Sequence, residues 1–281
     1  MNSASLRYFD AHTHVHFVAF DEDREAVFAR AKEAGVGMLL VGTQKDTSAA
    51  AVAAAETHEG VWAAVGLHPI HTTKSFHDKK ELGGDGSTPA GGFTSRGEDF
   101  SAAAYEALAR HPKVVAIGEC GLDYYRLDAG TKELQRDTFI AQIELANRVG
   151  KPLMLHIRDA YGDALQILKA HAKVHGNVHF FAGDWDIARQ FLDLGFTLSF
   201  TGVITFTHDY DEVVKNAPLS MLLSETDAPY VAPVPFRGQR NEPVHVQEVV
   251  KAIAAIRGEE GGRVLGALFE NARRAFNLAA V

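Results

Sequence analysis

The chain has 281 residues, of which 46% are hydrophobic and 23% charged, with one cysteine and a formal net charge of −8 at pH 7. This length suits one α/β barrel or two smaller domains, and the composition is that of a globular protein with a core of normal size. The acidic balance argues against a protein that holds nucleic acid through a broad basic surface. It does not exclude an enzyme that meets phosphate through bound cations.

The sequence gives no indication of a membrane or secreted protein. No stretch approaches the roughly 18 apolar residues that a membrane-spanning helix requires. The first thirty residues carry charged side chains at intervals and contain no apolar run of signal-peptide length. Because the single cysteine, Cys120, cannot form an internal disulfide, the chain fits a reducing compartment. We therefore expect a cytoplasmic protein, and no sequence feature indicates a stable protein partner.

Short apolar segments of strand character alternate with segments of helical period along the chain. Strands are predicted at 6–12, 36–42, 61–68, 114–119, 152–157, 177–181, 196–202 and 220–227. Helices are predicted at 22–34, 46–58, 99–110, 131–149, 159–175, 184–194, 209–216, 244–257 and 259–276. This alternation predicts a (β/α)₈ TIM barrel that forms a single domain over residues 1–281. An open doubly wound sheet is the alternative, but it usually carries a glycine-rich phosphate turn after its first strand, where this chain has His12 and His14.

Residues 77–97, HDKKELGGDGSTPAGGFTSRG, interrupt this pattern. They are rich in glycine, serine, threonine and charge, and they have no apolar period. The alternation of strands and helices resumes after them, so we predict a long flexible loop within one domain rather than a linker. The segment follows the third predicted strand, which would place it over the active-site face of a barrel.

Residue types that ligate metals stand at the carboxyl ends of six predicted strands. FDAHTHVHF at 9–17 has histidines at alternate positions, and alternate residues of a strand point the same way. Each histidine alone is more often a core or rim residue than a ligand. Barrel enzymes, however, build their sites from several strands at this end, so the set together predicts a metal site. Its members are His12 and His14, then His68, Glu119, His156, His179 and Asp227.

This set indicates which metals would bind. Even four of its five imidazoles together with its two carboxylates are too many for one tetrahedral ion, and mixed nitrogen and oxygen ligation suits Zn²⁺, Mn²⁺ or a similar ion such as Mg²⁺. A central carboxylate, for which Glu119 is best placed, could bridge two ions about 3.5–4 Å apart. We therefore predict two divalent metal ions and a hydrolytic reaction.

The motifs DxHTH, GLHP, GExGLDYY, LHxRDA, HFFxG, SETDAPY, RGQRNEP and NARRAFNL occur in this order over nearly the whole chain. This order resembles the TatD family of metal-dependent deoxyribonucleases, which have amidohydrolase-type barrels. The resemblance implies an exonuclease that acts on DNA ends, or on RNA ends. It further implies that Asp227 orients or deprotonates the attacking water, that His68 faces the scissile phosphate, and that Glu225 is a neighbouring acidic residue of the catalytic site. The metal ligands that it implies are His12, His14, Glu119, His156, His179 and Asp227.

Three positions depart from the family pattern. The chain has His16 where the family usually has aspartate, and Phe180 and Ala182 where it usually has cysteine and serine. None of the three is an implied metal ligand, so the departures bear on metal preference rather than on the chemistry. The segment 77–97 is also longer than the family normally has there, which bears on substrate size.

Two arginines are candidate substrate contacts. Arg237 lies in the loop after the eighth strand, where barrels often bind phosphate, and Arg158 lies two residues past His156. Each arginine could instead pair with structural carboxylates, which is the interpretation that we favour for Arg240.

Two other functions compete with the nuclease. The same barrel and metal chemistry serve amidases, lactonases and phosphotriester hydrolases that act on small molecules. Many such sites use a carboxylated lysine as the bridge, whereas the fourth strand here ends at Glu119, which favours the nuclease. A metal-binding or scaffold protein is the non-enzymatic alternative, but it would have no need of His68 and Glu225 beside a complete ligand set.

Overall fold

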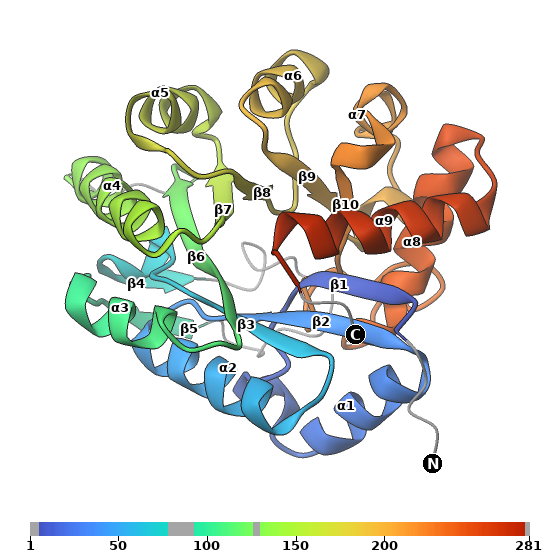
Figure 1. Cartoon of the computed structure of the whole chain (residues 1–281), viewed down its shortest axis with the longest axis horizontal. Helices are drawn as coiled ribbons and strands as arrows, with labels where there is room; N and C mark the ends of the chain where they lie inside the picture. The colour runs from blue at the N-terminus through green and yellow to red at the C-terminus, as the bar shows by residue number, and fades with distance from the viewer. Residues whose placement is uncertain (1–5, 78–92, 126–129, 279–281) are drawn as a thin grey trace.

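The structure is a computed structural model, and it describes residues 6–77, 93–125 and 130–278 of the chain. Eight parallel strands form its main sheet, and their order in space is their order along the chain. In Figure 1 the strands surround the middle of the molecule and the helices lie outside them. The strands are β1 (Tyr8–Thr13), β2 (Val36–Val41), β3 (Val61–Val65), β6 (Val114–Asp123), β7 (Leu153–Arg158), β8 (Gly176–Val178), β9 (Thr197–Phe200) and β10 (Leu222–Ser224).

The last strand of the sheet returns to the first. Thr13 of β1 forms a parallel bridge with Ala228, which follows β10. Beside this bridge the N–H of Asp227 donates to the carbonyl of His12 at 2.8 Å. These contacts bring the two edges of the sheet together, and the predicted (β/α)₈ barrel is confirmed.

The predicted helices are also confirmed, with bounds that differ by a few residues at their ends. In the described part of the chain, no helix is long and apolar enough to cross a membrane. The helices are α1 (Arg24–Glu33), α2 (Lys45–Thr57), α3 (Ala102–Ala109), α4 (Thr131–Val149), α5 (Tyr161–His171), α6 (Trp185–Asp193), α7 (Asp211–Asn216), α8 (Val246–Arg257) and α9 (Gly261–Ala275).

Apolar side chains fill both sides of the sheet. β2 is buried at every position, as expected of a parallel strand that is covered on both faces. Met38 and Leu40 pack with the helices, whereas Leu39 belongs to a second cluster that draws on the strands and on the end of α9. In that cluster the ring of Phe9 lies 6.4 Å from the ring of Phe276. The barrel interior is therefore packed, and polar side chains can gather only at its carboxyl end.

The prediction of a loop over 77–97 is wrong at both of its ends. His77 is the last residue of β4 (Lys74–His77), and Phe93–Arg96 forms β5, which pairs with β4 in an antiparallel hairpin. Strands of four mostly polar residues carry no apolar period, which is why the sequence pattern did not indicate them. Residues 78–92 of the predicted loop lie outside the described residues.

Two other strands differ from their predicted bounds in ways that affect the site. β6 continues to Asp123 rather than ending at Glu119, and its pairing with β7 is irregular between Ile117 and Cys120. Glu119 thus lies at an irregularity within the strand. β8 has only three residues and ends just before His179.

Gln142 joins α4 to the loop that follows β3. Its Oε1 accepts the N–H of Leu67 at 2.8 Å, and its Nε2 donates to the carbonyl of Leu67 at 2.9 Å, with both residues buried. Gln142→Ala leaves two buried backbone groups without partners, so we expect the free energy of unfolding in urea to fall by about 2 kcal/mol. The control is Gln190→Ala on α6, which we expect to change it by less than about 0.5 kcal/mol. Equal losses in the two variants would contradict this role.

Candidate metal centre

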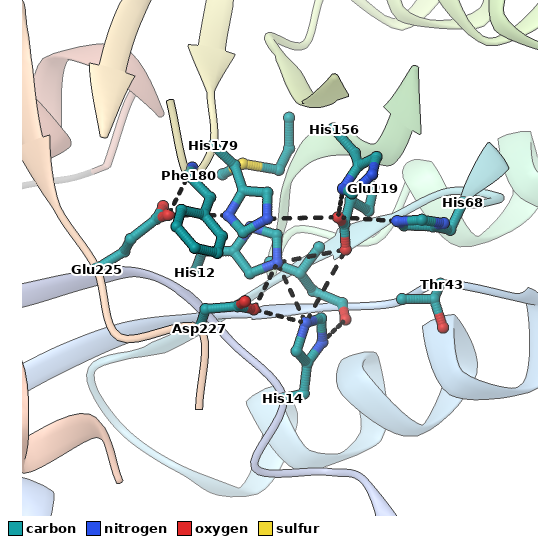
Figure 2. Close-up of polar contacts among 12 residues, drawn as sticks. His12, His14, Thr43, His68, Glu119, His156, His179, Phe180, Glu225 and Asp227 are labelled. Atoms are coloured by element: carbon teal, nitrogen blue, oxygen red, sulfur yellow. Dashed lines mark hydrogen bonds and ion pairs between the residues drawn. The ribbon is translucent and has the colours of Figure 1, made fainter. Parts of the chain in front are cut away.

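Metal-ligating side chains gather in one cavity at the carboxyl ends of the strands (Figure 2). The cavity has a volume of about 530 Å³. Of the predicted ligands only His12 is absent from its walls, because His12 is fully buried just behind them. The predicted residues that line the cavity are His14, His68, Glu119, His156, His179, Asp227, Arg158 and Arg237.

Glu119 stands at the centre of this cluster. Its Oε2 lies 3.3 Å from Nε2 of His12 and 3.9 Å from Nε2 of His14. Its Oε1 lies 3.0 Å from Nδ1 of His156 and 3.5 Å from Nε2 of His179. Apart from His68, which also approaches Oε1, each carboxylate oxygen faces a different pair of imidazoles, which is the arrangement that a ligand shared by two ions needs.

Asp227 completes the first pair. The Nε2 atoms of His12 and His14 are 3.2 Å apart, and they lie 3.8 and 3.4 Å from Oδ1 of Asp227. Nδ1 of His14 donates to the carbonyl of Val41 at 2.7 Å, so in the neutral ring the lone pair is on Nε2. Two imidazole nitrogens and a carboxylate oxygen thus face a common point, as metal ligands do.

The second pair is held by two further carboxylates. Nε2 of His156 donates to Oδ2 of Asp123 at 2.9 Å, and Nδ1 of His179 donates to Oε1 of Glu225 at 2.9 Å. In each ring the opposite nitrogen is the one that faces Glu119. A carboxylate behind a histidine selects its tautomer and makes the opposite nitrogen a better ligand.

His68 is oriented differently from the other imidazoles. Its Nδ1 accepts the N–H of Ile70 at 3.1 Å, so the proton of the neutral ring is on Nε2, 3.3 Å from Oε1 of Glu119. Burial lowers the pKa of His68, which favours this neutral form. A protonated Nε2 donates a hydrogen bond and does not ligate a metal. We therefore interpret His68 as a donor that faces the cavity, although it lies close enough to Glu119 and His156 to be grouped with them as a ligand.

The pKa values of the imidazoles differ according to whether a carboxylate bonds the nitrogen that faces away from Glu119. Burial lowers the pKa of His12 to about 3. Burial opposes protonation of the second pair too, but Asp123 and Glu119 raise the pKa of His156 to about 9, and Glu225 raises that of His179 to about 10. The cavity thus stabilises positive charge beside Glu119. A divalent ion meets the same demand when it displaces these protons.

The residues present therefore fit divalent metal ions. Among the described residues, the ligand atoms lie within 4.8 Å of one another in three overlapping groups. The groups are His12, His14 and Asp227; His12, Glu119 and His179; and His68, Glu119 and His156. Nitrogen and carboxylate ligands in this mixture suit Zn²⁺ or Mn²⁺. His12 and His14, with Asp227 beside them, face one oxygen of Glu119, whereas His156 and His179 face the other.

Glu225 acts on the cavity only through its neighbours. Its Oε1 accepts the N–H of Phe180 at 2.7 Å besides the proton of His179, and its Oε2 accepts the hydroxyl of Ser199 at 2.5 Å. The side chain is fully buried and does not line the cavity. These contacts describe a buried acidic neighbour of the site that positions His179.

Two carboxylates of the site were not among the predicted site residues. Asp123 lines the cavity behind His156, and the aspartate of GLDYY was the available signal. Asp10, the first residue of DxHTH, is fully buried and accepts the N–H and hydroxyl of Thr226 at 2.8 and 2.5 Å. Burial raises the pKa of Asp10 well above its ordinary value. Asp10 therefore ties the strand that carries His12 to the segment that carries Asp227.

Backbone strain is concentrated at the cavity. Phe180, Asp227 and Val231 line it, and their φ angles are 44°, 55° and 51°. Side chains other than glycine rarely adopt this left-handed region, and a β-branched valine does so least readily. Such residues cost on the order of 1–3 kcal/mol each and are typical of ligand sites, where the surrounding contacts impose them.

Comparison with known proteins decides the family. A family model described as TatD related DNase matches residues 9–277. The chain belongs to this family. It is 37% identical over 275 residues to the uncharacterized metal-dependent hydrolase YabD of Bacillus subtilis (strain 168). The aligned region covers 96% of this chain and 99% of YabD.

Two further relatives agree. The chain is 36% identical over 265 residues to the 3'-5' ssDNA/RNA exonuclease TatD of Klebsiella pneumoniae (strain 342), covering 90% of this chain and 91% of that protein. The crystal structure of YjjV, a TatD homolog from Escherichia coli K12, superposes with a TM-score of 0.82 at 31% identity, covering 97% of this chain and 99% of YjjV. The predicted family and its barrel are therefore confirmed.

The three departures from the TatD family pattern lie in different places. The ring of His16 is buried 6.1 Å from that of His14 and does not line the cavity. Phe180 and Ala182 do line it, beside His179. The departures at these two positions therefore bear directly on the shape of the substrate cavity.

The three arginines considered in the sequence also lie in different places: one makes structural contacts and two line the cavity. Arg240 donates to Asp23 at 2.7 Å and to the carbonyl of Ala19 at 2.8 Å, which confirms its structural role. Arg158 and Arg237 line the cavity instead. The guanidinium of Arg158 lies 3.7 Å from the ring centre of Tyr125, and that of Arg237 lies 4.0 Å from the ring centre of Phe206.

Replacing Glu225 tests whether it positions His179 as a ligand. In Glu225→Gln the amide oxygen can still accept the proton of His179, but the negative charge that makes the ring a stronger ligand is lost. We expect the affinity for Zn²⁺, measured by competition with a chelating dye, to fall about tenfold. Glu144→Gln, an exposed position on α4, is the matched control and should leave it unchanged. The positioning role is refuted if the two variants bind Zn²⁺ equally well.

Proposed function

We propose that this TatD-family protein is a divalent-metal-dependent exonuclease that removes nucleotides from the ends of single-stranded DNA or RNA. The observation that carries the proposal is the convergence of four imidazoles on the two oxygens of Glu119 at the wall of an open cavity, with Asp227 beside two of these imidazoles. The exonuclease named among its relatives supports the same substrate.

The ligands divide between two ions. His12, His14 and Asp227 would hold one ion, His156 and His179 the other, and Glu119 would contact both. Two such ions lower the pKa of a water molecule and stabilise the attacking and leaving oxygens of an in-line phosphoryl displacement. His12 holds its place through the buried backbone of β1, and His179 holds its place through Glu225.

Asp227 is the residue that we assign to the proton of the attacking water. Its carboxylate lines the cavity, and its N–H is bound to the carbonyl of His12. The carboxylate is therefore fixed beside the ligands, where it can orient the water and accept its proton.

His68 and the two arginines would hold the substrate. The Nε2–H of His68 points toward Glu119 and is available to donate to a phosphate oxygen in the same space. Arg158 and Arg237 line the cavity and suit phosphates of the same strand. An acidic protein with few phosphate contacts should show a shallow dependence of binding on salt.

The two-ion arrangement predicts a stoichiometry. Elemental analysis after reconstitution should approach two divalent ions per chain, because two ligand sets share Glu119. We expect His12→Ala to reduce this value toward one and Glu119→Ala to reduce it further. A content near zero that neither substitution changes would refute the metal centre.

The exonuclease is tested with end-labelled single- and double-stranded DNA, RNA, lactones and amides under several divalent ions. We expect metal-dependent release of mononucleotides from single strands, and Asp227→Asn should reduce kcat by at least about 100-fold because proton transfer and water orientation are lost. Metal content is measured in parallel, because Asp227 is also a proposed ligand. The control is Asp209→Asn, an exposed residue. Metal-loaded protein that leaves all nucleic acids intact but opens lactones or cleaves amides would identify the small-molecule hydrolase instead.

A further inference from the structure

One wall of the cavity takes no part in the metal centre. It is built by the segments that follow β8, β9 and β10, and its side chains are mostly apolar or aromatic. Apart from Arg237, which we assign to a substrate phosphate, none of these side chains has a role in the proposed hydrolysis. Its members are Ala182, Val203, Phe206, Tyr210, Val231 and Arg237.

Phe206 is the most exposed aromatic side chain of this wall. It is 44% exposed, although a folded protein normally gains by burying a ring of this size. It is one of only a few large apolar side chains that the described residues leave exposed, and of these it alone lines the cavity. An apolar ring held open in this position indicates a ligand with an apolar face.

The backbone that carries Phe206 is fixed. The ring follows a short 3₁₀ helix at Gly202–Thr205, whose first residue touches a neighbouring segment so closely that a Cβ on Gly202 would lie 2.5 Å from the carbonyl oxygen of Val231. The hydroxyl of Thr205 accepts the N–H of Val234 at 2.9 Å, and the N–H of Phe206 donates to Val203 at 3.2 Å. Phe206 is therefore presented on a rigid turn.

Arg237 lies against the ring of Phe206 on the apolar wall of the cavity. Its Nη1 donates to the carbonyl of Ala232 at 2.8 Å, and its guanidinium lies 4.0 Å from the ring centre of Phe206. The guanidinium thus stacks on the ring and still borders the cavity. A flat apolar surface next to a cation, both continuous with a metal centre, suits a ligand that combines a flat ring with an anionic phosphate.

We propose that Phe206, supported by Arg237, is a stacking subsite for the unpaired base of the nucleotide next to the scissile phosphate. This rests on the proposed exonuclease. A base stacks on an aromatic ring through its π face whatever its identity, so the subsite tolerates every sequence. A base inside a duplex is covered on both faces by its neighbours, so the subsite selects single-stranded ends. A lipid chain would instead need an apolar surface without the adjoining cation and metal ligands.

The experiment compares two substrates in the metal-loaded enzyme. One is a single-stranded oligodeoxynucleotide, and the other has the same sequence with an abasic nucleotide at each end. We expect Phe206→Ala to raise KM about tenfold for the first substrate and to leave KM for the second unchanged, because only the first offers a terminal base to stack. Phe206→Trp should retain the wild-type KM. Leu134→Ala is the control, since Leu134 is 39% exposed on α4 and does not line the cavity.

Three results would overturn the subsite. One is an unchanged KM of Phe206→Ala for the intact oligonucleotide. Another is an equal rise for both substrates, which would show that Phe206 supports the cavity without contacting a base. If wild-type enzyme with its metals cleaves neither oligonucleotide, the proposed exonuclease itself fails and the subsite fails with it. Cleavage by the wild type together with either of the first two results refutes the subsite alone.

Discussion

The site depends on the burial of one carboxylate among imidazoles. Glu119 is almost completely removed from water, and an isolated buried carboxylate carries a desolvation cost of several kcal/mol unless positive charge compensates it. The imidazoles of His12, His14, His156 and His179 surround it at 3.0–3.9 Å, so the compensation comes as protons on the rings or as cations between the rings and the carboxylate. The folded protein therefore requires positive charge next to the buried carboxylate of Glu119.

The barrel places these ligands together because the residues that close it also carry the ligands: their backbone groups join the two edges of the sheet, and their side chains face the cavity or lie just behind it. His12 lies in the first strand and Asp227 follows the last strand, and the hydrogen bond from the Asp227 N–H to the His12 carbonyl joins the two edges of the sheet. Asp10 adds a buried carboxylate that accepts two hydrogen bonds from Thr226. A change that weakens the contact between β1 and the segment after β10 would also separate His12 from Asp227. The stability of this contact and the geometry of the metal centre are thus coupled.

The order of strands and the ligand types could be predicted from the sequence, because parallel barrels present the carboxyl ends of their strands on one face. Which nitrogen of each imidazole carries the proton could not be predicted from the sequence. His68 and His156 are both histidines near strand ends, and only their partners distinguish them: Ile70 donates to Nδ1 of His68, whereas Asp123 accepts from Nε2 of His156. Phe206 was missed for a related reason, since an apolar residue near a strand end is usually part of the core.

The two sides of the cavity are built by different parts of the chain. The residues that would hold the metal ions are therefore distinct from those that would select the substrate. The metal-ligating side depends on strands and on buried carboxylates such as Glu225, where a substitution disturbs several hydrogen bonds at once. The apolar side is formed by the segments after β8, β9 and β10, with Ala182 and Phe206 exposed at its surface. Side chains there can change without moving a ligand. Members of the family that share the metal centre are therefore free to differ in substrate, and the difference should be sought in these segments rather than in the strands.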